Sequence, residues 1–275
     1  MKPYTLNIRG RLVRFDRPAV MGIVNVTDNS FYAPSRVSDK QALVDRVGDM
    51  LRAGASIIDI GACSTRPGSA APTAEQEAER LCKAIETVRE SFGTEVVISA
   101  DTYRASVARS AFEAGADIIN DVGGGTLDAE MFDTVAELHA PYVLMHMRGT
   151  PATMQSMTDY ADVTAEVIAD LSYKLRMLSD AGVADVIVDP GFGFAKTLEQ
   201  NYSLLANLNA FSVLGKPVLV GVSHKSMLKA VAADTLAATT AVNMVALQAG
   251  AAIVRVHEVE AASAAVKVFE MINNL

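Results

Sequence analysis

The sequence has few cysteines, no excess of basic residues and no long apolar run, and each shortage excludes a class of protein. Its 275 residues include two cysteines, Cys63 and Cys82, which form neither a C-x-x-C pair nor a zinc-binding spacing. This sparing use of cysteine suits a reducing compartment. The formal net charge of −8 and the pI near 5.1 argue against nucleic acid as a general partner. An anionic substrate would therefore need a local basic pocket.

Membrane and targeting signals are also missing. No stretch approaches the ~18 consecutive apolar residues of a membrane helix, and Met1 to Leu6 lack the apolar segment of a signal peptide. We therefore expect a cytoplasmic protein with no membrane partner. The chain shows no linker or low-complexity segment, and half of its residues are hydrophobic. This predicts one domain over residues 1–275 with a large core.

What the chain does contain is one pattern used many times. Eight short runs are rich in Val, Ile and Leu without alternation, as in parallel strands buried on both faces. They are Met21–Val26, Ser56–Ile60, Val96–Ala100, Asp117–Asp121, Tyr142–His146, Val186–Asp189, Val218–Val222 and Ala252–His257. Helical stretches separate them, among them Lys40–Ala53, Ala74–Ser91, Arg104–Ala114, Ala129–Leu138, Val163–Ala181, Leu198–Asn209 and Thr239–Ala249.

Four of these helices end in a repeated Ala-Gly signature, at Gly54, Gly115, Gly182 and Gly250. Glycine commonly stops a helix at this position. Eight repeated βα units predict a closed (β/α)₈ TIM barrel of the α/β class. The competing fold is an open doubly wound sheet, but no G-x-G-x-x-G follows the first strand.

The first residues of the chain predict a different element. Residues Tyr4–Phe15 alternate around Arg9-Gly10-Arg11, which indicates a small β-hairpin. We expect this hairpin, within residues 1–18, to close the bottom of the barrel.

Polar residues follow every predicted strand, at the end where such barrels build their active sites. They are Asn25 and Thr27, Asp59, Asp101, Asn120 and Asp121, His146, Asp189, Ser223 to Lys225, and Arg255 with His257. One polar residue is ordinary for a strand leaving the core. Eight such ends favour a pocket in which these side chains converge.

The chemistry of these residues divides into two groups. Asp101, Asn120 and Asp189 carry carboxylate and amide groups that can pair with the edge of a heterocycle. Asp101 could instead cap the helix that follows it. Lys225, Arg255 and His257 follow the last two strands, where barrels often bind phosphate. Arg255 and His257 share one face of their strand, and the arginine fork suits phosphate. Lys225 could also be an ordinary lysine at a helix start.

Three loops stand out by length and content. Residues 27–36 and 61–68 are long enough to close over a substrate. Asp189-Pro190-Gly191-Phe192-Gly193-Phe194 is glycine-rich, so its backbone could approach a ligand and its phenylalanines could stack on a flat ring. The alternative for this segment is a tight turn with core aromatics.

In this order, eight motifs resemble the dihydropteroate synthases, folate-pathway enzymes inhibited by sulfonamides. They are Met-Gly-Ile-Val-Asn-Val-Thr (21–27), Ser-Thr-Arg-Pro-Gly (64–68), Asp101-Thr102, Ile-Asn-Asp (119–121), Met-His-Met (145–147), Asp-Pro-Gly-Phe-Gly-Phe (189–194), Lys-Ser-Met (225–227) and Arg-Val-His (255–257). The resemblance runs from about Val20 to the end. It implies a transferase that joins 6-hydroxymethyl-7,8-dihydropterin pyrophosphate to p-aminobenzoate and releases pyrophosphate, with Mg²⁺ as cofactor and a homodimer as assembly.

The resemblance also implies a role for each matching residue. Asp101, Asn120, Asp189, Phe194 and Lys225 would hold the pterin. Asn25, Thr65, Arg255 and His257 would hold the pyrophosphate, with Asn25 also at the Mg²⁺. Phe31, Thr65, Arg66, Pro67, Phe194 and Ser226 would form the p-aminobenzoate site. The catalytic residues would be Asp101, Lys225, Arg255 and His257.

This set of residues fits the implied reaction. Loss of pyrophosphate leaves positive charge on the pterin methylene, which Asp101 can stabilise. Arg255, His257 and Mg²⁺ can stabilise the leaving anion. The aryl amine then attacks, held in line by the closed loops.

The sequence departs from the family at four places. Asp28-Asn29 stands where Pro-Asp is usual, Cys63 where Glu is common, and His224 where Arg is usual. Gly123-Gly124-Gly125 indicates unusual flexibility. These departures leave a second hypothesis open, a non-catalytic paralogue that binds a pterin without turning it over.

Three other classes of function have less support. The phosphate-binding Arg255-Val256-His257 argues against a pterin-dependent methyltransferase. A metal-dependent hydrolase using His146, His224 and His257 would usually show His-x-His after the first strand, where this chain has Asn25-Val26-Thr27. A Schiff-base aldolase using Lys225 would need that lysine within its strand rather than beyond it.

Overall fold

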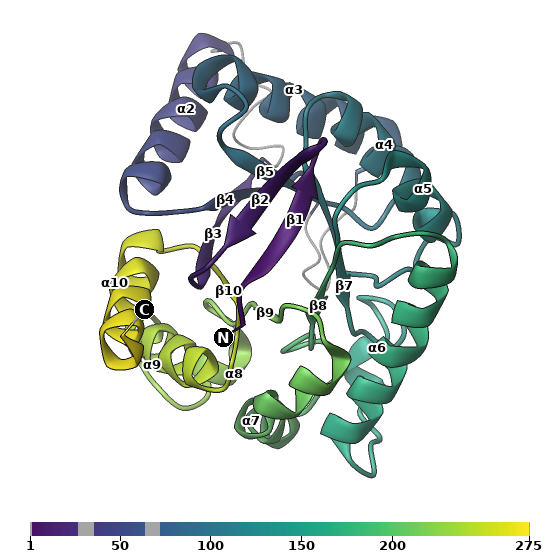
Figure 1. The fold of residues 1–275 in the computed structure, drawn as a ribbon, viewed down its shortest axis with the longest axis vertical. Coiled ribbons are helices and arrows are strands. Elements are labelled where there is room, and N and C mark those ends of the chain that lie inside the picture. The colour runs from purple at the N-terminus through teal and green to yellow at the C-terminus, as the bar shows by residue number, and fades with distance from the viewer. Residues whose placement is uncertain (1, 27–35, 64–71, 275) are drawn as a thin grey trace.

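The chain folds into a barrel of eight parallel strands surrounded by helices (Figure 1), in a computed structural model that describes residues 2–26, 36–63 and 72–274. The strands are β3 (Ala19–Asn25), β4 (Ile57–Gly61), β5 (Val97–Asp101), β6 (Ile118–Asp121), β7 (Tyr142–Met145), β8 (Val186–Asp189), β9 (Leu219–Val220) and β10 (Ile253–Val256). They pair in the order β8-β7-β6-β5-β4-β3-β10-β9. A parallel bridge between Val188 and Val218 joins the two ends, which confirms the predicted TIM barrel.

Helices cover the outside of this barrel. They are α2 (Arg36–Arg52), α3 (Ala74–Phe92), α4 (Ala105–Glu113), α5 (Met131–Leu138), α6 (Val163–Asp180), α7 (Leu198–Ala206), α8 (Ser226–Lys229), α9 (Thr235–Gln248) and α10 (Val259–Asn273), with 3₁₀ turns η1 (Met154–Ser156) and η2 (Leu208–Leu214). The four glycines of the Ala-Gly signature have φ between 88° and 119°. Glycine therefore stops these helices as the sequence predicts.

No helix among the described residues is long and apolar enough to cross a membrane.

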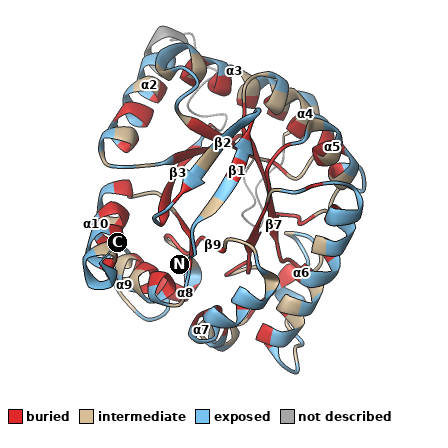
Figure 2. Ribbon diagram, in the orientation of Figure 1, coloured by how far each residue is buried: buried red, intermediate tan, exposed pale blue. Residues whose placement is uncertain are grey.

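Both faces of the strands are buried, which Figure 2 shows as red strands inside the ring of helices. On β4, Ile58 and Ile60 belong to the core between strands and helices, whereas Ile57 belongs to the core inside the barrel. Successive residues of a strand point to opposite faces. This double burial explains why the strands read as continuous apolar runs.

The predicted hairpin is present as β1 (Tyr4–Ile8) and β2 (Arg11–Phe15), paired antiparallel with Ile8 opposite Arg11. The two turn residues, Arg9 and Gly10, have φ of 50° and 83°. Two left-handed residues form the tight turn that matches the twist of a hairpin. Leu6, Ile8 and Phe15 pack into the core inside the barrel. The hairpin thus covers the end where the strands begin, and it crosses that opening in Figure 1.

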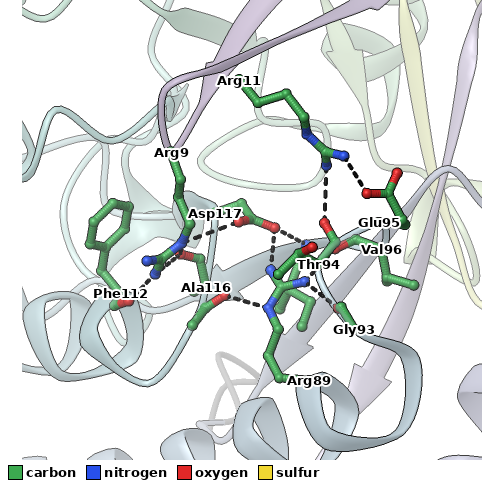
Figure 3. Close-up of polar contacts among 12 residues, drawn as sticks. Arg9, Arg11, Arg89, Gly93, Thr94, Glu95, Val96, Phe112, Ala116 and Asp117 are labelled. Atoms are coloured by element: carbon green, nitrogen blue, oxygen red, sulfur yellow. Dashed lines mark hydrogen bonds and ion pairs between the residues drawn. The ribbon is translucent and has the colours of Figure 1, made fainter.

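Arginines attach the hairpin tip to the barrel (Figure 3). The Arg9 Nη2 donates to the carbonyl of Ala116 at 2.8 Å, and its Nε lies 3.3 Å from the Asp117 carboxylate. Arg89 approaches Asp117 from α3 and forms an ion pair with its Oδ2. The same Oδ2 accepts from the Ile98 backbone N at 2.9 Å. Asp117, whose side chain is 3% exposed, therefore links the hairpin, α3 and β5.

Candidate active site

The candidate site begins where the apolar inner core of the barrel ends. Ile57, Ile118, Ile187 and Ile253 all belong to that core. Two residues further along each strand the side chain is polar, and these positions are Asp59, Asn120, Asp189 and Arg255; on β5, Asp101 follows Ser99 in the same way. Because residues i and i+2 share a face, polar groups from β4, β5, β6, β8 and β10 lie inside the carboxyl end of the barrel.

Arg255 lies at the centre of this polar cluster. Its Nε donates to Asp59 Oδ2 at 2.6 Å. Its Nη2 lies 2.5 Å from the same oxygen and 2.6 Å from Asp101 Oδ2. Asn120 Nδ2 donates to both carboxylate oxygens of Asp59 at 3.2 Å. One guanidinium therefore joins two carboxylates, and the fully buried Asp59 also fixes the amide of Asn120.

Burial and charge change the proton affinity of these groups. The pKa of Asp101 is raised to about 7, mainly because the carboxyl is buried; Arg255 opposes this shift and the nearby Asp59 adds to it. Burial would lower the pKa of the Arg255 guanidinium, but Asp59 and Asp101 reverse this and raise it above its usual value. Arg255 therefore stays charged, while Asp101 titrates near neutral pH.

The glycine-rich turn after β8 forms a second side of the site. Asp189 Oδ1 accepts from Gly191 N at 2.8 Å, and burial raises the pKa of this carboxyl. Lys225 Nζ donates to the carbonyl of Phe192 at 2.5 Å and lies 4.8 Å from the centre of the Phe194 ring. Burial lowers the pKa of Lys225 to about 8. Asp189 and Lys225 thus both hydrogen-bond to the backbone of one turn.

The two phenylalanines of this turn have different environments. Phe192 is fully buried in the core between strands and helices, as the core-aromatic alternative predicts. Phe194 is partly buried and lies beside Lys225, so its ring is available to a ligand. Gly191 has φ of 71°, and a Cβ there would lie 2.0 Å from the carbonyl oxygen of His146. Only glycine therefore fits this turn.

His257 lies beside Arg255, beyond the end of β10. Its Nδ1 is 2.9 Å from Ser223 Oγ. Burial lowers the pKa of His257 to about 4, so the ring is neutral at pH 7. Asn25 is exposed at the end of β3, and Ser226 is exposed at the start of α8. Phe31, Thr65, Arg66 and Pro67, together with the departures at Asp28 and Asn29, lie outside the residues that the structure describes.

The prediction that the polar residues at all eight strand ends converge is wrong for Asp121 of β6 and for His146 after β7. Asp121 points outward, where it accepts from Tyr142 Oη at 2.6 Å and from Gly125 N at 2.7 Å. His146 Nδ1 lies 3.0 Å from Lys196 Nζ in a separate buried contact. The strand pleat explains both cases, because each follows an inward-facing residue, Asn120 or Met145.

Gly123-Gly124-Gly125, which the sequence predicts to be flexible, form a hydrogen-bonded turn around Asp121. Asp121 Oδ1 accepts from Gly123 N at 2.6 Å, and Asp121 Oδ2 accepts from Gly125 N at 2.7 Å. A Cβ on Gly124, which has φ of 55°, would lie 2.1 Å from the carbonyl oxygen of Met145. Gly124 is therefore needed for close approach of the backbone to β7.

Two alternatives at Asp101 and Lys225 are also resolved. Asp101 does not cap α4, whose first residue, Ala105, donates its N–H to Asp128 Oδ2 at 2.8 Å. Lys225 does lie at the N-cap of α8, but its ammonium points back to the turn after β8. The sequence places Asp59 among the polar residues at the strand ends but does not indicate its role. Its position two residues after the inward-facing Ile57 is the signal that places it in the site.

The implied Mg²⁺ has one fitting ligand among the described residues. Asn25 offers an exposed amide oxygen at the end of β3. Magnesium prefers oxygen ligands, keeps several waters and often takes substrate phosphate oxygens. A single protein ligand at the rim therefore suits Mg²⁺ that arrives with a pyrophosphate.

The carboxylates, amide and two cations at the carboxyl end of this TIM barrel can bind a polar heterocycle that carries an anion. The family model described as "Pterin binding enzyme" matches residues 21–257. A dihydropteroate synthase of Synechocystis sp. is 40% identical over 259 residues, which cover 92% of this chain and 89% of that protein.

Two solved structures of Xanthomonas albilineans dihydropteroate synthase are similar over the whole barrel. The one with 4-aminobenzoic acid has a TM-score of 0.88 and 36% identity, covering 98% of each chain. The one with 7,8-dihydropteroate has a TM-score of 0.86 and 34% identity, covering 99% of this chain and 100% of that one. The chain therefore belongs to the dihydropteroate synthase family. This confirms the prediction that it is an enzyme that forms dihydropteroate.

Proposed function

We propose that residues at the carboxyl end of the barrel perform three tasks in the condensation of 6-hydroxymethyl-7,8-dihydropterin pyrophosphate with p-aminobenzoate. The first is pterin binding by Asp101, Asn120, Asp189 and Lys225. Carboxylates accept from the ring N–H and amine groups of a pterin, and the amide and ammonium donate to its carbonyl and ring nitrogens. The observation that carries this proposal is that Asp59 and Arg255 link Asn120 to Asp101, while Lys225 is close enough to Asp189 and Asp101 for both carboxylates to favour its charged form.

The second task is to hold and stabilise the pyrophosphate, with Arg255 and His257. Arg255 is charged and is held in place by Asp59 and Asp101, so its donors are preorganised for an anion. His257 is neutral and fixed through Ser223, so its other ring nitrogen can donate. Mg²⁺ at Asn25 would neutralise part of the charge that develops on the leaving group.

The third task is to guide the attack of the amine. Phe194 and Ser226 lie at the rim, and with Phe31, Thr65, Arg66 and Pro67 they would hold p-aminobenzoate. The reaction breaks the bond between the methylene carbon and pyrophosphate and forms a carbon–nitrogen bond. The ionised Asp101 lowers the energy of the positive methylene between these events.

Calorimetry with two ligands tests this division. Asn120→Ala should weaken 6-hydroxymethylpterin and its pyrophosphate ester equally. His257→Ala should weaken only the ester. Arg255→Ala should weaken both, because it leaves the carboxylates of Asp59 and Asp101 without their counter-charge. Equal losses for both ligands in His257→Ala would remove His257 from the pyrophosphate site.

We also propose a homodimer formed through α9 and α10, which pack against each other. Val268, Met271 and Ile272 are 52%, 80% and 60% exposed, and their spacing puts them on one stripe of α10. Val245 of the neighbouring α9 is also exposed, at 45%. Exposed apolar area of this kind marks an interface, and a second copy is the simplest occupant. Sedimentation of Met271→Glu should give a monomer; an unchanged dimer would place the interface elsewhere.

A further inference from the structure

We propose that His224, His257 and Glu258 form a binding site for a transition-metal ion of the Zn²⁺ class at the rim of the barrel. Their ligand atoms all lie within 4.8 Å of one another, and they are the only such group of His, Cys, Asp and Glu found in the described part of the chain. Two imidazoles and one carboxylate are the ligand set of many zinc sites with an open fourth position.

The two imidazole rings are already oriented for such an ion. His224 Nδ1 lies 3.0 Å from Thr235 Oγ1, and His257 Nδ1 lies 2.9 Å from Ser223 Oγ. A metal-binding histidine typically uses its second nitrogen in this way, which fixes the ring and its tautomer. Binding of an ion would select the tautomer in which each Nδ1–H donates to its hydroxyl and each Nε2 presents a lone pair to the metal. Without the ion, the Nε2–H of His224 donates to Glu258 Oε1 at 2.7 Å.

The carboxylate of Glu258 completes the group. Its Oε1 lies 2.7 Å from His224 Nε2. Its Oε2 is buried without a hydrogen-bond partner, which is costly for a carboxylate oxygen. Glu258 also occupies the N-cap position of α10 without capping it, so no helix contact holds the side chain back.

The geometry needs only side-chain adjustment. Ligands ~2.0–2.1 Å from a tetrahedral ion are about 3.3 Å from one another. The His224–Glu258 contact would open from 2.7 Å, and the widest separation would contract from at most 4.8 Å. His224 is held at φ of 56°, a strained value for a residue other than glycine and one that often marks a functional position.

This site differs from the proposed Mg²⁺ site in both ligands and place. Nitrogen-rich sets select Zn²⁺ and its neighbours, whereas Mg²⁺ prefers oxygen. Repulsion from Arg255 is limited, because Asp59 and Asp101 pair with its guanidinium. The proposal does not depend on the condensation reaction, since it can be tested without either substrate.

The test is titration of tag-free, chelator-treated protein with Co²⁺. Visible absorption is the readout, because it distinguishes four-coordinate from aqueous Co²⁺. Calorimetry with Zn²⁺ measures the affinity. The matched variants are His224→Asn and His139→Asn. Both histidines have left-handed backbone, with φ of 56° and 50°, and His139 is exposed at the far end of α5. Asparagine tolerates that conformation, so both variants should fold.

We expect one four-coordinate Co²⁺ per chain in the parent and in His139→Asn. Loss of a residue that only orients a metal ligand typically weakens metal affinity by ~10–100-fold, and we expect Thr235→Val to fall within that range. His224→Asn and Glu258→Gln remove a ligand and should weaken binding by more than this. Three results would overturn the proposal: no stoichiometric binding by the parent, equal losses in the two histidine variants, or a thiolate-to-Co²⁺ band that shows ligation by cysteine.

Discussion

The substitution Asp59→Asn tests the electrostatic arrangement inside the barrel. Asp59 and Asp101 share Nη2 of Arg255 at 2.5 and 2.6 Å, so their carboxylate oxygens are within about 5 Å of each other. Two like charges at about 5 Å in a medium of effective dielectric near 20 repel by roughly 3 kcal/mol, or about 2 pKa units. Removing the Asp59 charge should therefore lower the pKa of Asp101 from about 7 by roughly 1–2 units, since the rim is partly open to water.

The assay is kcat/KM for the pterin pyrophosphate as a function of pH, because this ratio reports ionisation of the free enzyme. Activity that needs the ionised Asp101 should rise with pH through about 7 in the parent and at lower pH in Asp59→Asn. Ionisation of the substrate is common to both enzymes and cancels in their ratio. An inflection that stays in place or moves to higher pH would refute this account of Asp101.

Two further substitutions test the scaffold. Asp117→Asn should lower the free energy of unfolding by about 3–5 kcal/mol, because it leaves Arg89 without its buried partner; urea unfolding near neutral pH measures this, and a loss below 1 kcal/mol would contradict it. Gly191→Ala should be much more destabilising than Gly182→Ala, since a Cβ at Gly191 meets the carbonyl oxygen of His146 at 2.0 Å while a Cβ at Gly182 meets nothing within 4 Å. Left-handed strain alone costs roughly 1–2 kcal/mol, so equal melting temperatures for the two variants would show that this turn tolerates a side chain.

The fold could be predicted from the sequence because its signals are repeated. Runs such as Val186–Asp189 are apolar on both faces, and only a strand buried on both sides requires this. The Ala-Gly helix ends gave the repeat its period, and the turn at Arg9-Gly10 located the hairpin. Each signal is local, so no knowledge of distant contacts was needed.

The site was less predictable because it depends on which face each strand end presents. Asn120 and Asp121 are neighbours of similar polarity, yet the pleat sends only Asn120 inward. His146 likewise leaves the site and contacts Lys196. Counting two residues along each strand from its inner-core residue selects Asn120 over Asp121 and Met145 over His146. The link from Arg255 to Asp59 could not be predicted, because it joins side chains 196 positions apart.

The most direct test of the central claim measures pyrophosphate release and pterin affinity together for the parent and Asp101→Asn. With both substrates and Mg²⁺, we predict release by the parent that requires p-aminobenzoate. Asp101→Asn should lower the rate by about 10²–10³, while calorimetry shows a smaller change in affinity for the pterin. A variant that keeps most of its turnover, or a parent that binds the pterin but releases no pyrophosphate, would contradict the claim that this barrel mouth stabilises a developing cation through Asp101.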